Sequence, residues 1–117
     1  MKLIMVRHTS VDVTPGTCYG QSDVGLRESF PVEAAAVASR IARYAPDRVY
    51  TSPLSRCVRL AEHCGYSDAL RDARLMEINF GEWEMKRFDE ITDPRINEWY
   101  DDFFNVRATG GESFADQ

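Results

Sequence analysis

The sequence predicts an α/β fold with a mostly parallel sheet that is covered by helices. Lys2–Val6 is a short apolar run without alternation, which is typical of a strand buried on both faces. Asp47–Thr51 is a second strand-like run, and a helical pattern follows each of the two. Strands that alternate with helices usually form parallel sheets.

The first helix is expected after a loop rich in Thr, Pro, Gly and Ser over residues 9–27. Ser29 can cap it, Pro31 suits an early helical position, and Glu33 adds an acid to the first turn. Its apolar face consists of Val37, Ile41 and Tyr44, and the helix should end near Ala45–Pro46.

A second helix is predicted to begin at Ser52–Pro53, with Ser52 as N-cap and Pro53 at the first helical position. Its buried face should contain Leu54, Val58, Ala61 and Cys64, and Gly65 suits its end. Arg74–Ile78 is expected to be a short strand or extended segment. Asp93–Pro94 begins a third helix, whose apolar side consists of Ile96, Trp99, Tyr100 and Phe103.

The last segment, Thr109–Ser113, has the composition of a loop that leads into a helix cap, yet four residues follow it. Two clear strands also make a thin sheet. We therefore expect residues 1–117 to be a single partial domain that is incomplete at its C-terminus. An incomplete sheet exposes apolar surface, so self-association is also expected.

Composition limits the partners and the compartment. The net charge of −5 argues against nucleic acid and anionic membranes, so an anionic ligand must be held by local cations. No apolar run is long enough to span a bilayer. The three cysteines, Cys18, Cys57 and Cys64, have no framework spacing, which indicates reduced thiols and a cytoplasmic protein.

Arg7 and His8 directly follow the first predicted strand. Ligands of open α/β sheets bind beyond the carboxyl ends of the strands, so His8 is placed where a reacting group belongs. A neutral imidazole can attack phosphorus and carry the phosphoryl group, if a fixed acceptor, such as a backbone carbonyl, holds its other nitrogen. Arg7 offers a planar fork of donors to phosphate oxygens. Alone, the pair is more often an exposed loop feature.

Thr51–Arg56 also follows a strand and opens a helix. The positive end of that helix, together with Arg56 in its first turn, can neutralise a phosphate. Glu77 lies in the apolar stretch Leu75–Phe80, where burial would favour a protonated carboxyl that donates to a leaving oxygen. The alternative for Thr51–Arg56 is a well-capped surface helix. The alternative for Glu77 is an ion pair with Arg71 or Arg74.

Taken together, four ordered motifs resemble those of the histidine phosphatase (phosphoglycerate mutase-like) superfamily. They are Arg7-His8-Thr9, Thr51-Ser52-Pro53-Leu54-Ser55-Arg56, Leu75-x-Glu77-x3-Gly81-x-Trp83-Glu84 and Gly111-Glu112-Ser113. The resemblance implies a three-layer α/β/α fold, no metal or other cofactor, and a phosphohistidine intermediate on His8. It also implies Arg7 and Arg56 as phosphate ligands and Glu77 as proton donor.

The segment Cys18–Asp23, with Leu26, resembles the substrate-side loop of the α-ribazole phosphatase branch. Gln21 of this loop is therefore expected among the substrate- and phosphate-binding residues, together with Thr9 and Thr14 of the loop after His8. Thr9 stands where most members have Gly, Thr14 where many have Asn, and Gly25 where Pro is usual.

The second histidine of the family, in a later His-Gly pair, has no counterpart in this sequence. His63 does not replace it, because it lies about 10 Å of helix rise beyond Arg56, away from the helix N-terminus. We expect His63 to be a surface or packing residue.

The sequence thus predicts a hydrolase of small phosphorylated metabolites, with α-ribazole 5′-phosphate as the leading substrate. Two alternatives remain open. One is a mutase of the phosphoglycerate type, which returns the phosphate to a second hydroxyl. The other is a phosphate-binding module without turnover, because the second histidine is absent.

Overall fold

The computed structural model describes all residues, 1–117, and they form two compact units. The first contains Met1–Asp12 and Asp23–Leu75, and the second contains Val13–Ser22 and Met76–Gln117. The chain therefore starts in the first unit, enters the second at Val13, returns to the first at Asp23 and enters the second again at Met76. A single partial domain over residues 1–117 stays a prediction.

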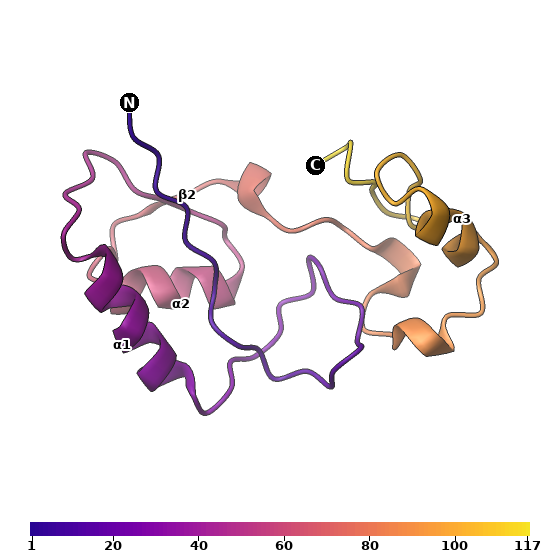
Figure 1. Cartoon of the computed structure of the whole chain (residues 1–117), viewed down its shortest axis with the longest axis horizontal. Coiled ribbons are helices and arrows are strands. Elements are labelled where there is room, and N and C mark those ends of the chain that lie inside the picture. Colours follow the sequence, from indigo (N-terminus) through magenta and orange to yellow (C-terminus); the bar gives the residue numbers. More distant parts are fainter. The chain divides into compact units, whose positions relative to one another are not determined.

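The first unit is an α/β arrangement, which confirms the predicted fold class. In chain order it contains helix α1 (Phe30–Ile41), strand β1 (Tyr50–Thr51), helix α2 (Ser55–His63) and strand β2 (Leu70–Arg71). The strands are parallel, with Tyr50 opposite Leu70 and Thr51 opposite Arg71. Helix α2 connects them and contacts both β1 and α1 (Figure 1). A 3₁₀ turn, η1 (Ala73–Leu75), follows β2.

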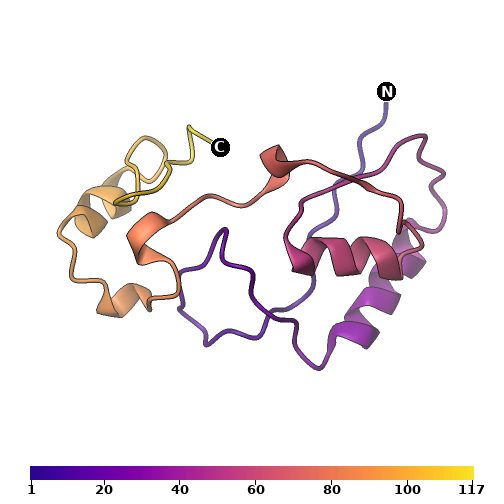
Figure 2. The same cartoon turned by 180° about the vertical axis from the view of Figure 1, so that it is seen from behind.

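The strand predicted over Lys2–Val6 is wrong for this structure. The segment has no regular secondary structure and belongs to no sheet, and its residues are exposed, Leu3 at 76% and Met5 at 86%. Its apolar composition favours a strand, but a strand needs a hydrogen-bonded neighbour. The sheet contains only β1 and β2, and neither pairs with this segment (Figure 2).

Helix α1 ends at Ile41, before the predicted end near Ala45–Pro46, and helix α2 begins later than predicted. Ser29 is the N-cap residue of α1 as predicted, although its hydroxyl donates to the Glu33 carboxylate at 2.6 Å instead of capping the backbone. Helix α2 begins two residues later than expected, because Leu54 takes the N-cap position. Ser52 instead accepts a hydrogen bond from the Leu54 N–H through its hydroxyl, at 3.3 Å.

The strand or extended segment expected over Arg74–Ile78 is only partly correct. Residues Ala73–Leu75 form η1, and the residues after it are irregular. The strand of this region is β2 instead, four residues earlier than Arg74, in a segment that the apolar pattern did not mark.

The second unit is held by an aromatic core. Cys18, Trp83, Ile91, Ile96 and Ala108 are buried together, with Phe80, Phe88 and Trp99 packed against them. The elements are the 3₁₀ turns η2 (Gly81–Trp83) and η3 (Phe88–Glu90) and the helix α3 (Arg95–Asp101). Ile96 of α3 is buried as predicted, but Tyr100 and Phe103 are more than half exposed.

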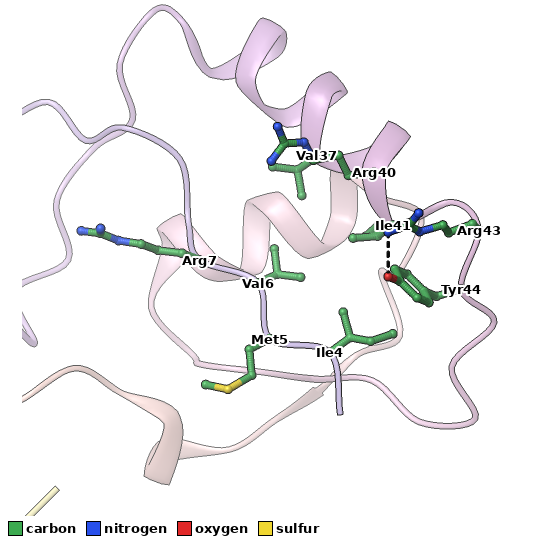
Figure 3. Close-up of a pocket in the computed structure, with 9 residues that line it drawn as sticks. All are labelled: Ile4, Met5, Val6, Arg7, Val37, Arg40, Ile41, Arg43 and Tyr44. Atoms are coloured by element: carbon green, nitrogen blue, oxygen red, sulfur yellow. Dashed lines mark hydrogen bonds between the residues drawn. The ribbon is translucent and has the colours of Figure 1, made fainter. Parts of the chain in front are cut away.

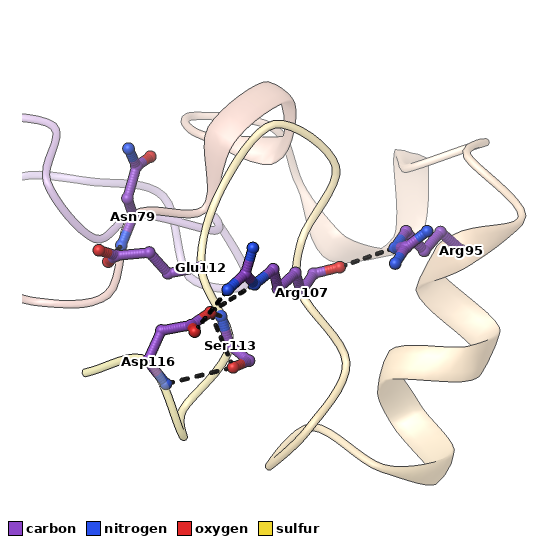
Figure 4. A network of polar contacts seen from close by, with 6 residues as sticks. All are labelled: Asn79, Arg95, Arg107, Glu112, Ser113 and Asp116. Atoms are coloured by element: carbon purple, nitrogen blue, oxygen red, sulfur yellow. Dashed lines mark hydrogen bonds and ion pairs between the residues drawn. The ribbon is translucent and has the colours of Figure 1, made fainter.

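The cap expected near Ser113 is present. Ser113 donates its N–H to Asp116 at 2.9 Å, and Asp116 returns its own N–H to the Ser113 hydroxyl at 3.3 Å (Figure 4). This reciprocal exchange is the geometry of a capping box. Arg107 holds the same carboxylate with two hydrogen bonds of 2.7 and 2.8 Å. None of the helices combines the length and the apolar composition that a membrane span requires.

Candidate active site

His8 has the tautomer that a nucleophile requires. Its Nδ1–H donates to the carbonyl oxygen of Thr9 at 2.7 Å. A carbonyl only accepts, so Nδ1 carries a proton, and in the neutral form of this tautomer the lone pair is on Nε2. The ring is half-buried. The backbone acceptor expected from the sequence is therefore present.

Arg7 precedes His8 and is exposed. Ile4, Val6, Val37, Ile41 and Tyr44 help to line a hollow of about 290 Å³ beside helix α1. In Figure 3 the guanidinium of Arg7 points away from the apolar side chains of that hollow. Arg7 thus borders the hollow, and its donors are directed away from the apolar side chains.

Backbone pairing fixes the segment that follows His8. Val11 forms an antiparallel bridge with Leu26, and the N–H of Asp12 donates to the Gly25 carbonyl at 2.8 Å. The chain that leaves the His8 loop is therefore bonded to the chain that returns from the second unit. This return places Asp23 beside helix α2.

Asp23 caps helix α2 in place of the predicted Ser52. Its Oδ1 accepts from the N–H of Ser55 at 2.9 Å and from the Ser55 hydroxyl at 2.6 Å. These hydrogen bonds, helped by the charge of Arg56, lower the pKa of Asp23. A carboxylate at a helix N-terminus is stabilised by the helix dipole. The expectation that this helix end offers its N–H groups to phosphate is therefore wrong for Ser55.

Polar residues of the predicted motifs are buried in the first unit. Arg56 is 1% exposed, and Thr9 is 6% exposed with its hydroxyl oxygen lacking any hydrogen-bond partner. Thr51 and Ser52 are buried as well. Burying polar groups is costly unless they are hydrogen-bonded, and Thr51 and Ser52 make hydrogen bonds within the chain, whereas the Thr9 hydroxyl makes none.

The remaining predicted residues belong to the second unit. Glu77 is exposed, so the expected burial of its carboxyl is wrong, because the chain after η1 is irregular instead of a buried strand. Its Oε1 accepts from the N–H of Ile78 at 3.2 Å. Thr14 is exposed and accepts from the Thr17 N–H at 3.1 Å through its carbonyl. Gln21 is half-buried.

His63 and the three cysteines are the other residues whose side chains could react or bind a metal. His63 is exposed at the last turn of α2 and packs edge-on against Phe30, with ring centroids 5.7 Å apart, as expected for a surface or packing residue. All three cysteines are free thiols, and burial raises the pKa of Cys18 to about 12. No three His, Cys, Asp or Glu side chains gather so that they could hold a metal ion.

Two polar residues of this region were missed from the sequence. Asp23 caps α2 from 32 residues away, and Glu84 binds three residues of the segment Gly20–Ser22 from more than 60 residues away. Both occur within the quoted motifs, but periodicity and cap rules describe only local partners. The signal in the sequence was that each of these two carboxylates lies in a motif and has no partner among its neighbours along the chain.

Comparison with known proteins identifies the class. The model of the histidine phosphatase superfamily (branch 1) matches residues 3–117, and the chain belongs to this superfamily. Among curated relatives, phosphoserine phosphatase 1 of Hydrogenobacter thermophilus is 29% identical over 98% of this chain. The chain spans 58% of the length of that relative.

Solved structures agree with the fold. The protein TTHB049 from Thermus thermophilus has a TM-score of 0.76 and 28% identity, over 95% of this chain and 63% of its own. A candidate alpha-ribazole-5′-P phosphatase from Escherichia coli K-12 has a TM-score of 0.78, over 94% of this chain and 58% of its own. At 23% identity, this second likeness concerns the fold alone.

Proposed function

We propose that the protein hydrolyses phosphomonoesters through a phosphohistidine on His8. The observation that carries this proposal is the hydrogen bond from His8 Nδ1–H to the Thr9 carbonyl, which leaves Nε2 as a nucleophile. Membership of the histidine phosphatase superfamily supports the same role.

In the first step the Nε2 lone pair of His8 attacks phosphorus. The bond from phosphorus to the ester oxygen breaks, and its electron pair stays on the leaving oxygen. Arg7 and Arg56 hold the phosphoryl oxygens and stabilise the charge that develops on them. Glu77, which must enter this step in its protonated form, gives its proton to the leaving oxygen, and the product departs as an alcohol.

In the second step water attacks phosphorus and the bond to Nε2 breaks, which restores the neutral imidazole of His8. Glu77, now ionised, takes the proton of the water. The products are inorganic phosphate and an alcohol, so atoms and protons balance without a further reactant.

Thr9 is assigned to phosphate binding. Its hydroxyl is buried and lacks a partner, and a phosphate oxygen is an acceptor that would satisfy it. We also assign Gln21 to the substrate side, on the basis of the loop resemblance around Cys18–Asp23, and Thr14, which stands where many members of the superfamily have Asn.

For the substrate we propose a small phosphorylated metabolite, with α-ribazole 5′-phosphate and phosphoserine as the two compounds to test. The loop sequence supports the first, and the relative named as a phosphoserine phosphatase supports the second. We propose that the protein is cytoplasmic and binds neither nucleic acid nor membrane, consistent with its charge of −5.

Self-association is a further proposal, supported by exposed apolar side chains. Leu3, Met5, Tyr50 and Leu70 are each at least half exposed, in or near extended segments. Such surface favours pairing of chains. Small-angle scattering of the purified protein should show a dimer or larger species, and a monodisperse monomer would contradict this proposal.

The enzymatic proposal is tested with Arg56→Lys and, as its matched control, Arg59→Lys on the exposed side of the same helix. A lysine cannot reproduce the donor fork, so Arg56→Lys should lower kcat/KM about 100-fold. Arg59→Lys should stay within about threefold of wild type. Equal effects of the two substitutions would refute the role of Arg56. Release of inorganic phosphate distinguishes a hydrolase from a mutase, which would transfer it to a second hydroxyl.

A further inference from the structure

The carboxylate of Glu84 accepts four hydrogen bonds, three of them from a segment distant in sequence. Its Oε2 accepts from the Gly20 N–H at 3.0 Å and from the Ser22 hydroxyl at 2.7 Å. Its Oε1 accepts from the N–H groups of Gln21 at 2.9 Å and Phe80 at 3.2 Å. Two carboxylate oxygens offer about four acceptor positions, and all of them are used here.

No cation pairs with this carboxylate, so its negative charge is stabilised by N–H and O–H donors alone. Partial burial raises the pKa of Glu84, but these four hydrogen bonds outweigh it and lower the pKa below its usual value. The charged form is therefore the one that binds the segment Gly20–Ser22 at neutral pH.

The backbone of Glu84 is itself held firmly. It follows Trp83, which is fully buried and whose indole N–H donates to Asp93 at 3.0 Å. On its other side, the Met85 N–H donates to the Cys18 carbonyl at 2.7 Å. The carboxylate thus extends from the rigid core of the second unit.

The segment that Glu84 binds has little freedom to move. A Cβ on Gly20 would lie 1.8 Å from the carbonyl oxygen of Ile78 and 2.9 Å from the ring of Phe80. The backbone of Gly20 therefore lies directly against residues 78–80. Gln21, the residue assigned to the substrate side, is the next residue of this fixed backbone.

We propose that Glu84 is a positioning residue for substrate recognition, which fixes the Gly20–Ser22 backbone and thereby the side chain of Gln21. This inference rests on the proposed function, because it assigns Gln21 to the substrate side. Glu84 acts on the binding of the organic part of the ester. It takes no part in phosphoryl transfer to His8.

The test compares Glu84→Gln with Glu82→Gln, whose carboxyl is exposed on the same turn. Glutamine keeps the shape but loses the charge and half of the acceptor capacity. With phosphoserine as the probe, Glu84→Gln should raise KM about tenfold and leave kcat within about threefold. Amide exchange at Gly20 and Gln21 should accelerate about tenfold, since the protecting acceptor is weakened. Glu82→Gln should change neither quantity.

Ser22→Ala supplies a milder second variant, should Glu84→Gln not fold. It removes one hydrogen bond and should raise KM about threefold. An unchanged KM in either folded variant, or a fall in kcat at constant KM, would overturn the proposal. If wild-type protein hydrolyses no phosphomonoester, the proposed function fails and the recognition role with it. Amide exchange then still reports whether Glu84 holds the segment.

Discussion

Gly20 provides a sharp test of the packing in the second unit. Replacing it with alanine would place a methyl group 1.8 Å from the Ile78 carbonyl oxygen, 2.9 Å from a Phe80 ring carbon and 3.0 Å from a Glu84 carboxylate oxygen. The first contact is with backbone, which cannot rotate away. The Gly20 segment must therefore shift, and its hydrogen bonds to Glu84 must weaken.

The expected loss is about 3 kcal/mol in the free energy of unfolding, the size typical of overpacking in a rigid site. With a urea dependence of about 2 kcal/mol per M, the unfolding midpoint should fall by about 1.5 M. Trp83 and Trp99 both lie in the second unit, and they are the two tryptophans of the chain. Their fluorescence therefore reports the unfolding of this unit.

Gly25→Ala is the control, and its unfolding is followed by circular dichroism, because Gly25 lies in the first unit. A Cβ at Gly25 would meet nothing within 4 Å. Its substitution should be neutral or stabilise by about 0.5 kcal/mol, because alanine restricts the unfolded chain. If Gly20→Ala unfolds at the same urea concentration as wild type, the described packing of Gly20 against Ile78 is wrong.

Three further predictions concern single interactions. Asp23→Ala should destabilise the first unit by about 1 kcal/mol, the usual value of an N-cap, as measured by helical circular dichroism in urea; no loss would contradict the cap on α2. Met85→Gly should stabilise by about 1 kcal/mol, because the φ of Met85 is +64° and its side chain is 51% exposed; a lower melting temperature would contradict this. Because the pKa of Glu84 is lowered on folding, its contribution should be present above the unfolded value of 4.5 and be lost as pH falls through the folded pKa. In Glu84→Gln, the free energy of unfolding measured by fluorescence should therefore depend less on pH in the acid range. An unaltered pH profile would exclude Glu84 as the source of that dependence.

The sequence was sufficient for the local and apolar parts of the fold. The cap at Ser113, the helices that begin near Ser29 and Pro94 and the burial of Ile96 follow from rules that involve neighbouring residues. Strand formation by Lys2–Val6 failed because pairing depends on a partner far along the chain, which no local pattern specifies.

In the candidate site, too, local interactions could be predicted from the sequence and long-range interactions could not. The acceptor for His8 is the carbonyl of the next residue, so its presence could be expected. Asp23 and Glu84 act over 32 and more than 60 residues, and hydrogen bonds of this range leave no periodic trace in a sequence. The burial expected for Glu77 failed because apolar neighbours in the sequence do not guarantee a buried backbone.

The proposed phosphohistidine forms on one imidazole, and the chain contains two histidines, His8 and His63. Incubation with a radiolabelled phosphomonoester, followed by rapid denaturation in alkali, should trap phosphate on the wild-type protein and on His63→Ala. The label should be stable to alkali, labile to acid and absent from His8→Ala. Equal labelling of His8→Ala and wild type would contradict the account.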